Sequence, residues 1–302
     1  MIKERIKKLP IIKQYLDRKR EKKFRIQLEE VYKRAADGSF MKDCDEVQKQ
    51  EWEQRIKMVK ECPDSAKISV LPNTVKLEGD YFIMHNGLKI RPLSYYGYPM
   101  LQLLHENKSI HEPQEEYVFQ EVLKFMPEGA TMIELGAYWS FYSMWFNKDV
   151  KNARNYMIEP WTLEHGINNF KINNLKGKFF QYYISEKPGI HHDGSKIISI
   201  DSFVKDQNID FVDLLHSDIQ GSELEMLQGA INTLSEGKVG YIFVSTHSNE
   251  LHKSCAGFLE KLGYSQVCSA NLDETYSYDG LLVYKNPDYK GIEKVEISLK
   301  GK

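Results

Sequence analysis

Two short segments each combine an apolar run with an acidic residue at its end. In the first, Glu134 and Gly136 close the run Thr131–Ile133, and a glycine there lets the backbone approach a ligand closely. In the second, Glu159 follows Tyr156–Ile158, 23 residues after Gly136. A carboxylate at this spacing can accept hydrogen bonds from both hydroxyls of an adenosine ribose. Together the two segments predict a nucleoside-binding site.

The residues after Gly136 restrict which nucleoside can bind. A dinucleotide fingerprint, G-x-G-x-x-G, needs further glycines beside the pyrophosphate, whereas Ala137 to Ser140 contain none. A phosphate loop of the form G-x-x-x-x-G-K is absent from the sequence as well. Nicotinamide and flavin dinucleotides are therefore disfavoured. A nucleoside without a diphosphate, such as S-adenosylmethionine, fits the pattern.

Three further side chains could move a proton during methyl transfer. Transfer from a sulfonium is an in-line displacement in which the acceptor hydroxyl must lose its proton. We expect His247 to be the base and Asp218 its orienting partner. His216 shares a strand face with Asp218 because strand side chains alternate, and is a third catalytic candidate. A buried histidine is more often a packed core residue, and Asp218 could equally cap the helix that begins near Ser222.

A divalent metal is the open question at this site. Asp218, Glu223 and His247 are ligand types that suit magnesium or manganese. The sequence holds no dense acidic cluster, and Glu223 also suits the first turn of a helix, where the macrodipole favours a carboxylate. Metal dependence therefore stays open.

These residues need a sheet to bring them together. From residue 113 onward, apolar runs that predict strands alternate with segments of helical periodicity. We expect strands at 131–136, 156–158, 179–184, 211–215, 241–245 and 281–284, and helices at 115–125, 165–172, 222–234 and 252–262. Such alternation predicts an α/β fold whose mostly parallel sheet is flanked by helices and binds ligands at the carboxyl ends of its strands. Ser185, which follows the third strand, is expected to contact the cofactor there.

The first 110 residues follow another pattern. Apolar residues near helical spacing predict a basic helical extension over 1–62, in which Pro10 interrupts or restarts the first helix. Short alternating segments around an Asn86-Gly87 turn predict a small β appendage over 63–110. The aromatic stretch Tyr95–Tyr98 ends it, and could stack on a sugar face or simply pack. Residues 111–302 form the expected ligand-binding domain.

Charge is concentrated at one end of the chain. Residues 1–34 carry 13 Lys and Arg against 5 Asp and Glu, a balance of +8, so the rest of the chain must sum to −10 to give the net −2. A basic amphipathic helix can lie on an anionic membrane or pack on a partner subunit, and ordinary helix packing is favoured. The acidic remainder disfavours nucleic acid. We expect a cytoplasmic protein, with the inner membrane surface and homo-oligomers as candidate partners.

Seven segments, taken in order, resemble the FkbM-type methyltransferases. The most specific is the run from Asp213 to Ala230, in which Asp218-Ile219-Gln220-Gly221 is followed by a helix of the family pattern. The other six are His111-Glu112-Pro113, Glu134 to Ala137, Ile158 to Pro160, the pair Asn169 and Asn173, Ile200 to Phe203, and His247. The similarity spans residues 111 to 284, and its specificity comes from the order of the seven segments.

The resemblance implies a class I, Rossmann-like methyltransferase fold and an S-adenosylmethionine cofactor bound by Glu134, Gly136, Ala137, Ser140, Glu159, Ser185 and Asp218. It further implies O-methylation of a hydroxyl, on a sugar of a surface glycan or glycolipid or on another metabolite. Three positions depart from the family pattern: Glu134 replaces its usual acidic residue, Ser140 its second glycine, and Ser245 a glutamate. These departures keep open the alternative of a noncatalytic scaffold in a glycan-assembly complex.

Overall fold

The computed structural model describes residues 10–301. Its centre is a seven-stranded sheet of strand order β12-β13-β11-β10-β4-β5-β6. All neighbours from β11 to β6 are parallel, while β13 runs antiparallel to both β11 and β12. The strands are β4 (Thr131–Leu135), β5 (Arg154–Ile158), β6 (Lys178–Phe180), β10 (Val212–Ser217), β11 (Val239–Thr246), β12 (Ser265–Ala270) and β13 (Gly280–Lys285). The mostly parallel α/β sheet expected from the sequence is confirmed.

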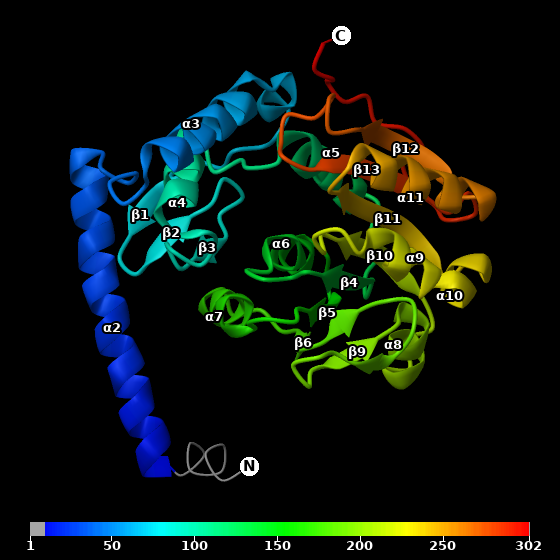
Figure 1. The fold of residues 1–302 in the computed structure, drawn as a ribbon, viewed down its shortest axis with the longest axis horizontal. Coiled ribbons are helices and arrows are strands. Elements are labelled where there is room, and N and C mark those ends of the chain that lie inside the picture. The colour runs from blue at the N-terminus through cyan, green and yellow to red at the C-terminus, as the bar shows by residue number, and fades with distance from the viewer. Residues whose placement is uncertain (1–9, 302) are drawn as a thin grey trace.

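Helices cover both faces of this sheet (Figure 1). One layer contains α5 (Pro113–Leu123), α6 (Phe141–Asp149) and α7 (Glu164–Ile172). The other contains α8 (Ile200–Asp206), α9 (Glu223–Gln228), α10 (Ile231–Ser235) and α11 (Asn249–Lys261). Each face has its own apolar core because strand side chains alternate. In β11, for example, Tyr241 and Phe243 belong to one core, whereas Ile242 and Val244 belong to the other.

Two expected elements are each divided in the structure. The strand expected at 179–184 is two short strands, because β6 pairs with β5 whereas β7 (Tyr183–Ile184) pairs with β9 (Lys196–Ile198) in a separate sheet. That small sheet is completed by β8 (Gly189–Ile190). The helix expected at 222–234 is interrupted between α9 and α10 at Gly229, where an added Cβ would meet the backbone of Ser185 and Glu186.

The N-terminal part packs against the same core as α5 and α6. It comprises α2 (Pro10–Asp37), α3 (Glu46–Glu61), the 3₁₀ helix η1 (Pro63–Ala66), a sheet of β1 (Lys76–Glu78), β2 (Tyr81–Ile83) and β3 (Lys89–Ile90), and α4 (Gly97–Glu106). Val31, Ile56 and Val59 are buried in the first core together with Phe119. Within the described residues, α2 runs from Pro10 to Asp37. The apolar periodicity predicted for residues 2–9 lies outside the described residues.

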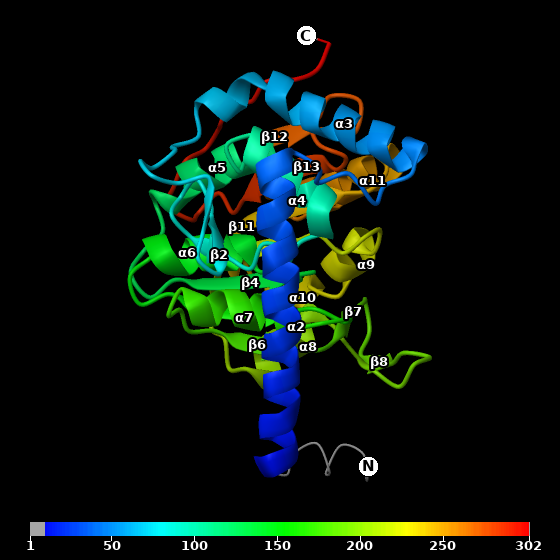
Figure 2. The ribbon, with the colours of Figure 1, turned by 90° about the vertical axis from the view of Figure 1, so that its left-hand side faces the viewer.

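Helix α2 is a long rod that leaves the body of the protein at its N-terminal end (Figures 1 and 2). Its C-terminal half is held by Val31 in the core and by the Tyr32 hydroxyl, which donates to the Gly79 carbonyl at 2.8 Å. Farther back, Phe24 lies 3.9 Å from the Arg91 guanidinium, and a groove of about 1080 Å³ separates α2 from α7. Within residues 10–301, no helix is both long and apolar enough to cross a bilayer.

Candidate active site

A cavity of about 320 Å³ opens at the carboxyl ends of β4, β5 and β10. Its floor consists of the turns that follow these strands, and Tyr95, Tyr96, His111 and Glu112 close it from the N-terminal side. Six of the site residues expected from the sequence line this cavity, namely Glu134, Gly136, Ala137, Glu159, His216 and Asp218. Strand ends of a parallel sheet meet at one edge, which is why residues far apart in the sequence share this cavity.

Gly136 is required by the packing of two strand ends. It has a φ of +70°, and a Cβ there would overlap the carbonyl group of Asp218. The Asp218 amide in turn donates to the Leu135 carbonyl at 3.1 Å. The glycine thus allows the turns after β4 and β10 to touch, which places the Asp218 side chain on the cavity wall.

Glu159 is held as an acceptor at the end of β5. Its two carboxylate oxygens accept from the amides of Trp161 at 2.7 Å and Tyr138 at 3.3 Å. Burial raises the pKa of this carboxyl above its ordinary value, although these amide hydrogen bonds oppose the shift. Each oxygen keeps a lone pair for a further donor. The geometry suits a pair of neighbouring hydroxyls.

Glu134 lies at the inner end of the cavity and is 4% exposed. The Ser143 amide, in the first turn of α6, donates to its Oε2 at 3.2 Å. Burial raises the pKa of Glu134 to about 7, although His216 and the α6 amides favour the charged form. A cationic ligand group beside it would therefore hold it as a carboxylate.

Ser140 and Ser185 lie outside the cavity. Ser140 precedes α6 in the left-handed conformation, with a φ of +62°, which is the backbone that the glycine of the family pattern would adopt without strain. Its side chain is buried beside Gly166. The Ser185 hydroxyl donates to Glu225 at 2.9 Å. Neither serine is positioned to contact a ligand in this cavity.

His216 is buried on the cavity wall and is bound to Glu115 of α5. Its Nε2 lies 2.6 Å from Glu115 Oε1, whose other oxygen accepts from the Ser245 hydroxyl at 3.1 Å. Burial lowers the pKa of His216, but Glu115 and Glu134 outweigh it and the net pKa is raised. The raised pKa favours the imidazolium form of His216 beside the Glu115 carboxyl group.

His247 sits among three carboxylates and outside the cavity lining. Its Nε2 lies 3.3 Å from both Asp218 and Asp279, and its Nδ1 lies 3.0 Å from Glu223. Burial lowers the pKa of His247, but these carboxylates raise it to about 10. An imidazolium has no lone pair with which to take a proton. The geometry therefore favours a role for His247 in holding Asp218.

Three of these residues, Asp218, Glu223 and His247, also carried the open question of a metal. Although three carboxylates face His247, no group of three or more His, Cys, Asp or Glu side chains in residues 10–301 is arranged to hold a metal ion. The imidazolium offsets part of their charge in this arrangement.

The segments that form this edge of the sheet match a known protein family. The family model for the methyltransferase FkbM domain matches residues 126–265. Residues 126–265 are a methyltransferase FkbM domain. The resemblance expected from the sequence is confirmed, and so are the class I methyltransferase fold and S-adenosylmethionine as the cofactor of the FkbM domain.

Solved structures are similar to part of the chain at low sequence identity. One is M. capricolum TrmK in complex with S-adenosyl-homocysteine, at 14% identity over 57% of this chain and 69% of that chain, with a TM-score of 0.40. Another is precorrin-6y C5,15-methyltransferase from Geobacter metallireducens, at 12% identity over 58% and 89%, with a TM-score of 0.39. No curated protein matches the sequence. Similarities this distant carry no argument about what the FkbM domain methylates.

The cavity of the FkbM domain includes residues that sequence reasoning did not assign to the site. Tyr95, Tyr96, His111 and Glu112 all lie before the matched span. Tyr95 stacks on Trp139 with ring centroids 4.3 Å apart, whereas Tyr98 lies under the Arg34 guanidinium, away from the cavity. The available signals were the aromatic stretch itself and the family-like His111-Glu112-Pro113. Neither indicates which of these side chains faces the ligand.

Proposed function

We propose that this S-adenosylmethionine-dependent methyltransferase transfers its methyl group to a hydroxyl of a sugar, in a surface glycan or a glycolipid. The single observation that carries the proposal is a cavity with aromatic walls that also presents several carboxylates. Aromatic faces pack on the apolar C–H faces of sugar rings, and carboxylates accept from hydroxyl groups. This combination suits a polyhydroxylated acceptor better than a flat, apolar one.

The residues present fit the cofactor. Glu159 offers two oxygens, each with a spare lone pair, to the ribose hydroxyls. Glu134 offers a buried carboxyl to the ammonium of the methionine end, and the Gly136–Ala137 turn leaves room for the chain between them. When bound, S-adenosylmethionine supplies a methyl group activated by a sulfonium. The chain's own task is to hold the acceptor hydroxyl in line with that methyl and to accept its proton.

Aromatic side chains at the cavity mouth support a sugar as the acceptor. Trp161 is 69% exposed and Tyr96 is 51% exposed, yet both line the cavity. Large exposed aromatic side chains beside a cavity are typical of binding surfaces. Behind them, Tyr95 and Trp139 form a buried stack that keeps the wall rigid. The proposed acceptor would enter between Tyr96 and Trp161.

The test compares surface glycans from cells with and without the protein. Mass spectrometry is expected to show a loss of one methylene equivalent per modified sugar when the gene is deleted, restored by the wild type and not by Glu159→Ala. Unchanged glycans together with a methylated small metabolite would move the acceptor to another class. Tight binding of S-adenosylmethionine with no methylated product would favour a noncatalytic role.

A further inference from the structure

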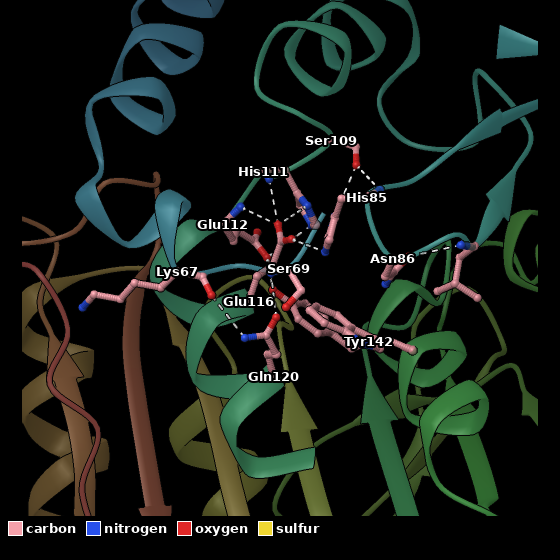
Figure 3. Close-up of polar contacts among 12 residues, drawn as sticks. Lys67, Ser69, His85, Asn86, Ser109, His111, Glu112, Glu116, Gln120 and Tyr142 are labelled. Atoms are coloured by element: carbon pink, nitrogen blue, oxygen red, sulfur yellow. Dashed lines mark hydrogen bonds and ion pairs between the residues drawn. The ribbon is translucent and has the colours of Figure 1, made fainter. Parts of the chain in front are cut away.

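A chain of buried polar side chains leads from the N-terminal sheet to the cavity wall (Figure 3). His85 Nε2 lies 3.6 Å from one oxygen of Glu116, and His111 Nδ1 lies 2.7 Å from the other. The amides of His111 and Glu112 donate to that same Glu116 oxygen at 2.7 and 3.1 Å. Glu116 Oε1 therefore accepts from both amides, while Oε2 has no hydrogen-bond partner among the described residues. Through these amides Glu116 fixes the turn that presents Glu112 to the cavity.

The electrostatic surroundings favour one charge state for each group in this chain of side chains before Glu112. Burial disfavours the charged form of Glu116, but His111 lowers its pKa below the ordinary value. The pKa of His111 is raised, because Glu116 and Glu112 outweigh its burial. The pKa of His85 is lowered by burial, so this ring is neutral. An ionised pair of Glu116 and His111 thus stands directly behind Glu112.

Glu112 is fixed at one oxygen and free at the other. The Tyr142 hydroxyl donates to its Oε2 at 2.9 Å, and His111 Nε2 lies 3.5 Å from the same oxygen. Among the described residues, none hydrogen-bonds Oε1, and the side chain lines the cavity. Burial raises the pKa of Glu112 to about 7, with His111 opposing and Glu115, Asp218 and Asp279 adding to the shift. A base is most effective when its pKa lies near the working pH.

The other charged groups of the cavity are engaged. His216 is bound to Glu115, and Asp218 is paired with the His247 imidazolium and accepts from Gln220 Nε2 at 2.9 Å. Glu134 accepts from the first turn of α6 and faces the inner end of the cavity. Glu112 combines a carboxyl group that Tyr142 holds at Oε2 with an Oε1 that no described residue engages.

We propose that Glu112 is the catalytic base of the reaction, accepting the acceptor hydroxyl proton on Oε1 while Tyr142 and His111 hold Oε2. This inference rests on the proposed function. As the bond between the acceptor oxygen and the methyl carbon forms, the carbon–sulfur bond breaks and its electron pair stays on sulfur. The hydroxyl proton passes to the Glu112 carboxylate, which later releases it to water. Charge and atoms balance without a metal or a further reactant.

The test compares Glu112→Gln with Glu121→Gln, a control farther along α5 whose carboxylate pairs with Lys124. Calorimetry with S-adenosylmethionine is expected to give dissociation constants within about twofold of wild type for both variants. Single-turnover transfer of labelled methyl to a cell-envelope glycan extract is expected to fall about 10²–10⁴-fold in Glu112→Gln only. The wild-type rate should rise with pH to a plateau above a midpoint of about 7.

A second measurement needs no acceptor. Infrared difference spectra of the wild type should show protonated-carboxyl bands from both Glu112 and Glu134 that titrate near pH 7, and the Glu112 band should be lost in Glu112→Gln. If wild-type protein binds S-adenosylmethionine but labels no glycan, the proposed function is contradicted. The infrared and binding measurements then still test the assignment of Glu112, because they need no acceptor. Tenfold weaker cofactor binding, wild-type transfer, or carboxyl bands unchanged from wild type in Glu112→Gln would each overturn the assignment.

Discussion

The substitution Gly136→Ala tests whether the glycine is needed for the contact between two strand ends. At a φ of +70°, any L side chain is strained, by about 1–2 kcal/mol in the left-handed region. The new Cβ would also overlap the Asp218 carbonyl. This neighbour is backbone and cannot rotate away, so the overlap adds the cost of overpacking, typically about 1–3 kcal/mol. The expected loss in the free energy of unfolding is therefore about 2–5 kcal/mol.

Gly129→Ala provides the matched control. Gly129 lies at the other end of β4, before its first residue, and has a φ of +78°, but a Cβ there meets nothing within 4 Å. It should therefore show only the strain of about 1–2 kcal/mol. Any gain from reduced freedom of the unfolded chain is common to both variants and cancels in their comparison.

Urea unfolding measured by circular dichroism, with and without S-adenosylmethionine, gives both quantities. We expect Gly136→Ala to be less stable than Gly129→Ala by about 1–3 kcal/mol and to lose most of the stabilisation by ligand. Gly129→Ala should keep that stabilisation in full. Equal stabilities of the two variants would show that the turns after β4 and β10 separate freely, and the reasoning from their close contact would be refuted.

Three further predictions follow from the same structure. Glu159→Ala should weaken S-adenosylmethionine binding at least tenfold in calorimetry with the fold retained. Glu164→Ala, a control at an exposed position of α7, should leave the affinity unchanged. Equal affinities of the two variants would refute the ribose assignment. The pKa of His247 is raised from 6.5 to about 10, so its proton contributes stability in full below pH 6.5, and this contribution is lost as the pH rises toward 10. The free energy of unfolding of His247→Gln, measured in urea, should therefore be lower than that of wild type at pH 6.5 and close to that of wild type near pH 10. The control His192→Gln, at an exposed position, should match wild type at both pH values. A difference between His247→Gln and wild type that does not depend on pH would contradict the cationic assignment. We further propose that the basic N-terminal segment contacts an anionic membrane or a partner subunit. Deleting residues 1–22, which spares Phe24 and the buried Val31, should alter liposome sedimentation or the mass measured by light scattering while cofactor affinity is kept. If neither changes, the segment makes neither contact.

The periodicity of apolar residues was sufficient to predict those strands and helices whose buried side chains recur at a regular spacing. Strands β4, β5, β10, β11 and β13 each carry an apolar run whose alternate side chains enter two cores, and α11 has one buried face. Helix α6 was not predicted, because Phe141 to Phe146 are buried all round and show no polar face with a helical period. Strand β12 and helices α4 and α8 were not predicted either.

The sequence by itself determined which residues stand at strand ends. Glu134, Gly136, Glu159 and Asp218 each follow an apolar run, and parallel strands bring such ends to one edge. This is a local property of each segment combined with a general rule of topology. It therefore needed no knowledge of distant contacts.

Only the tertiary structure decided the charge and the role of the titratable groups. His247 is surrounded by Asp218, Glu223 and Asp279, and His216 meets Glu115 across 101 residues of sequence. Glu112 reaches the cavity through a turn fixed by Glu116 and His111. A pKa depends on burial and on charges within a few ångströms. Those neighbours come from separate elements, so the proposed base is inferred from packing and not from the spacing of residues along the chain.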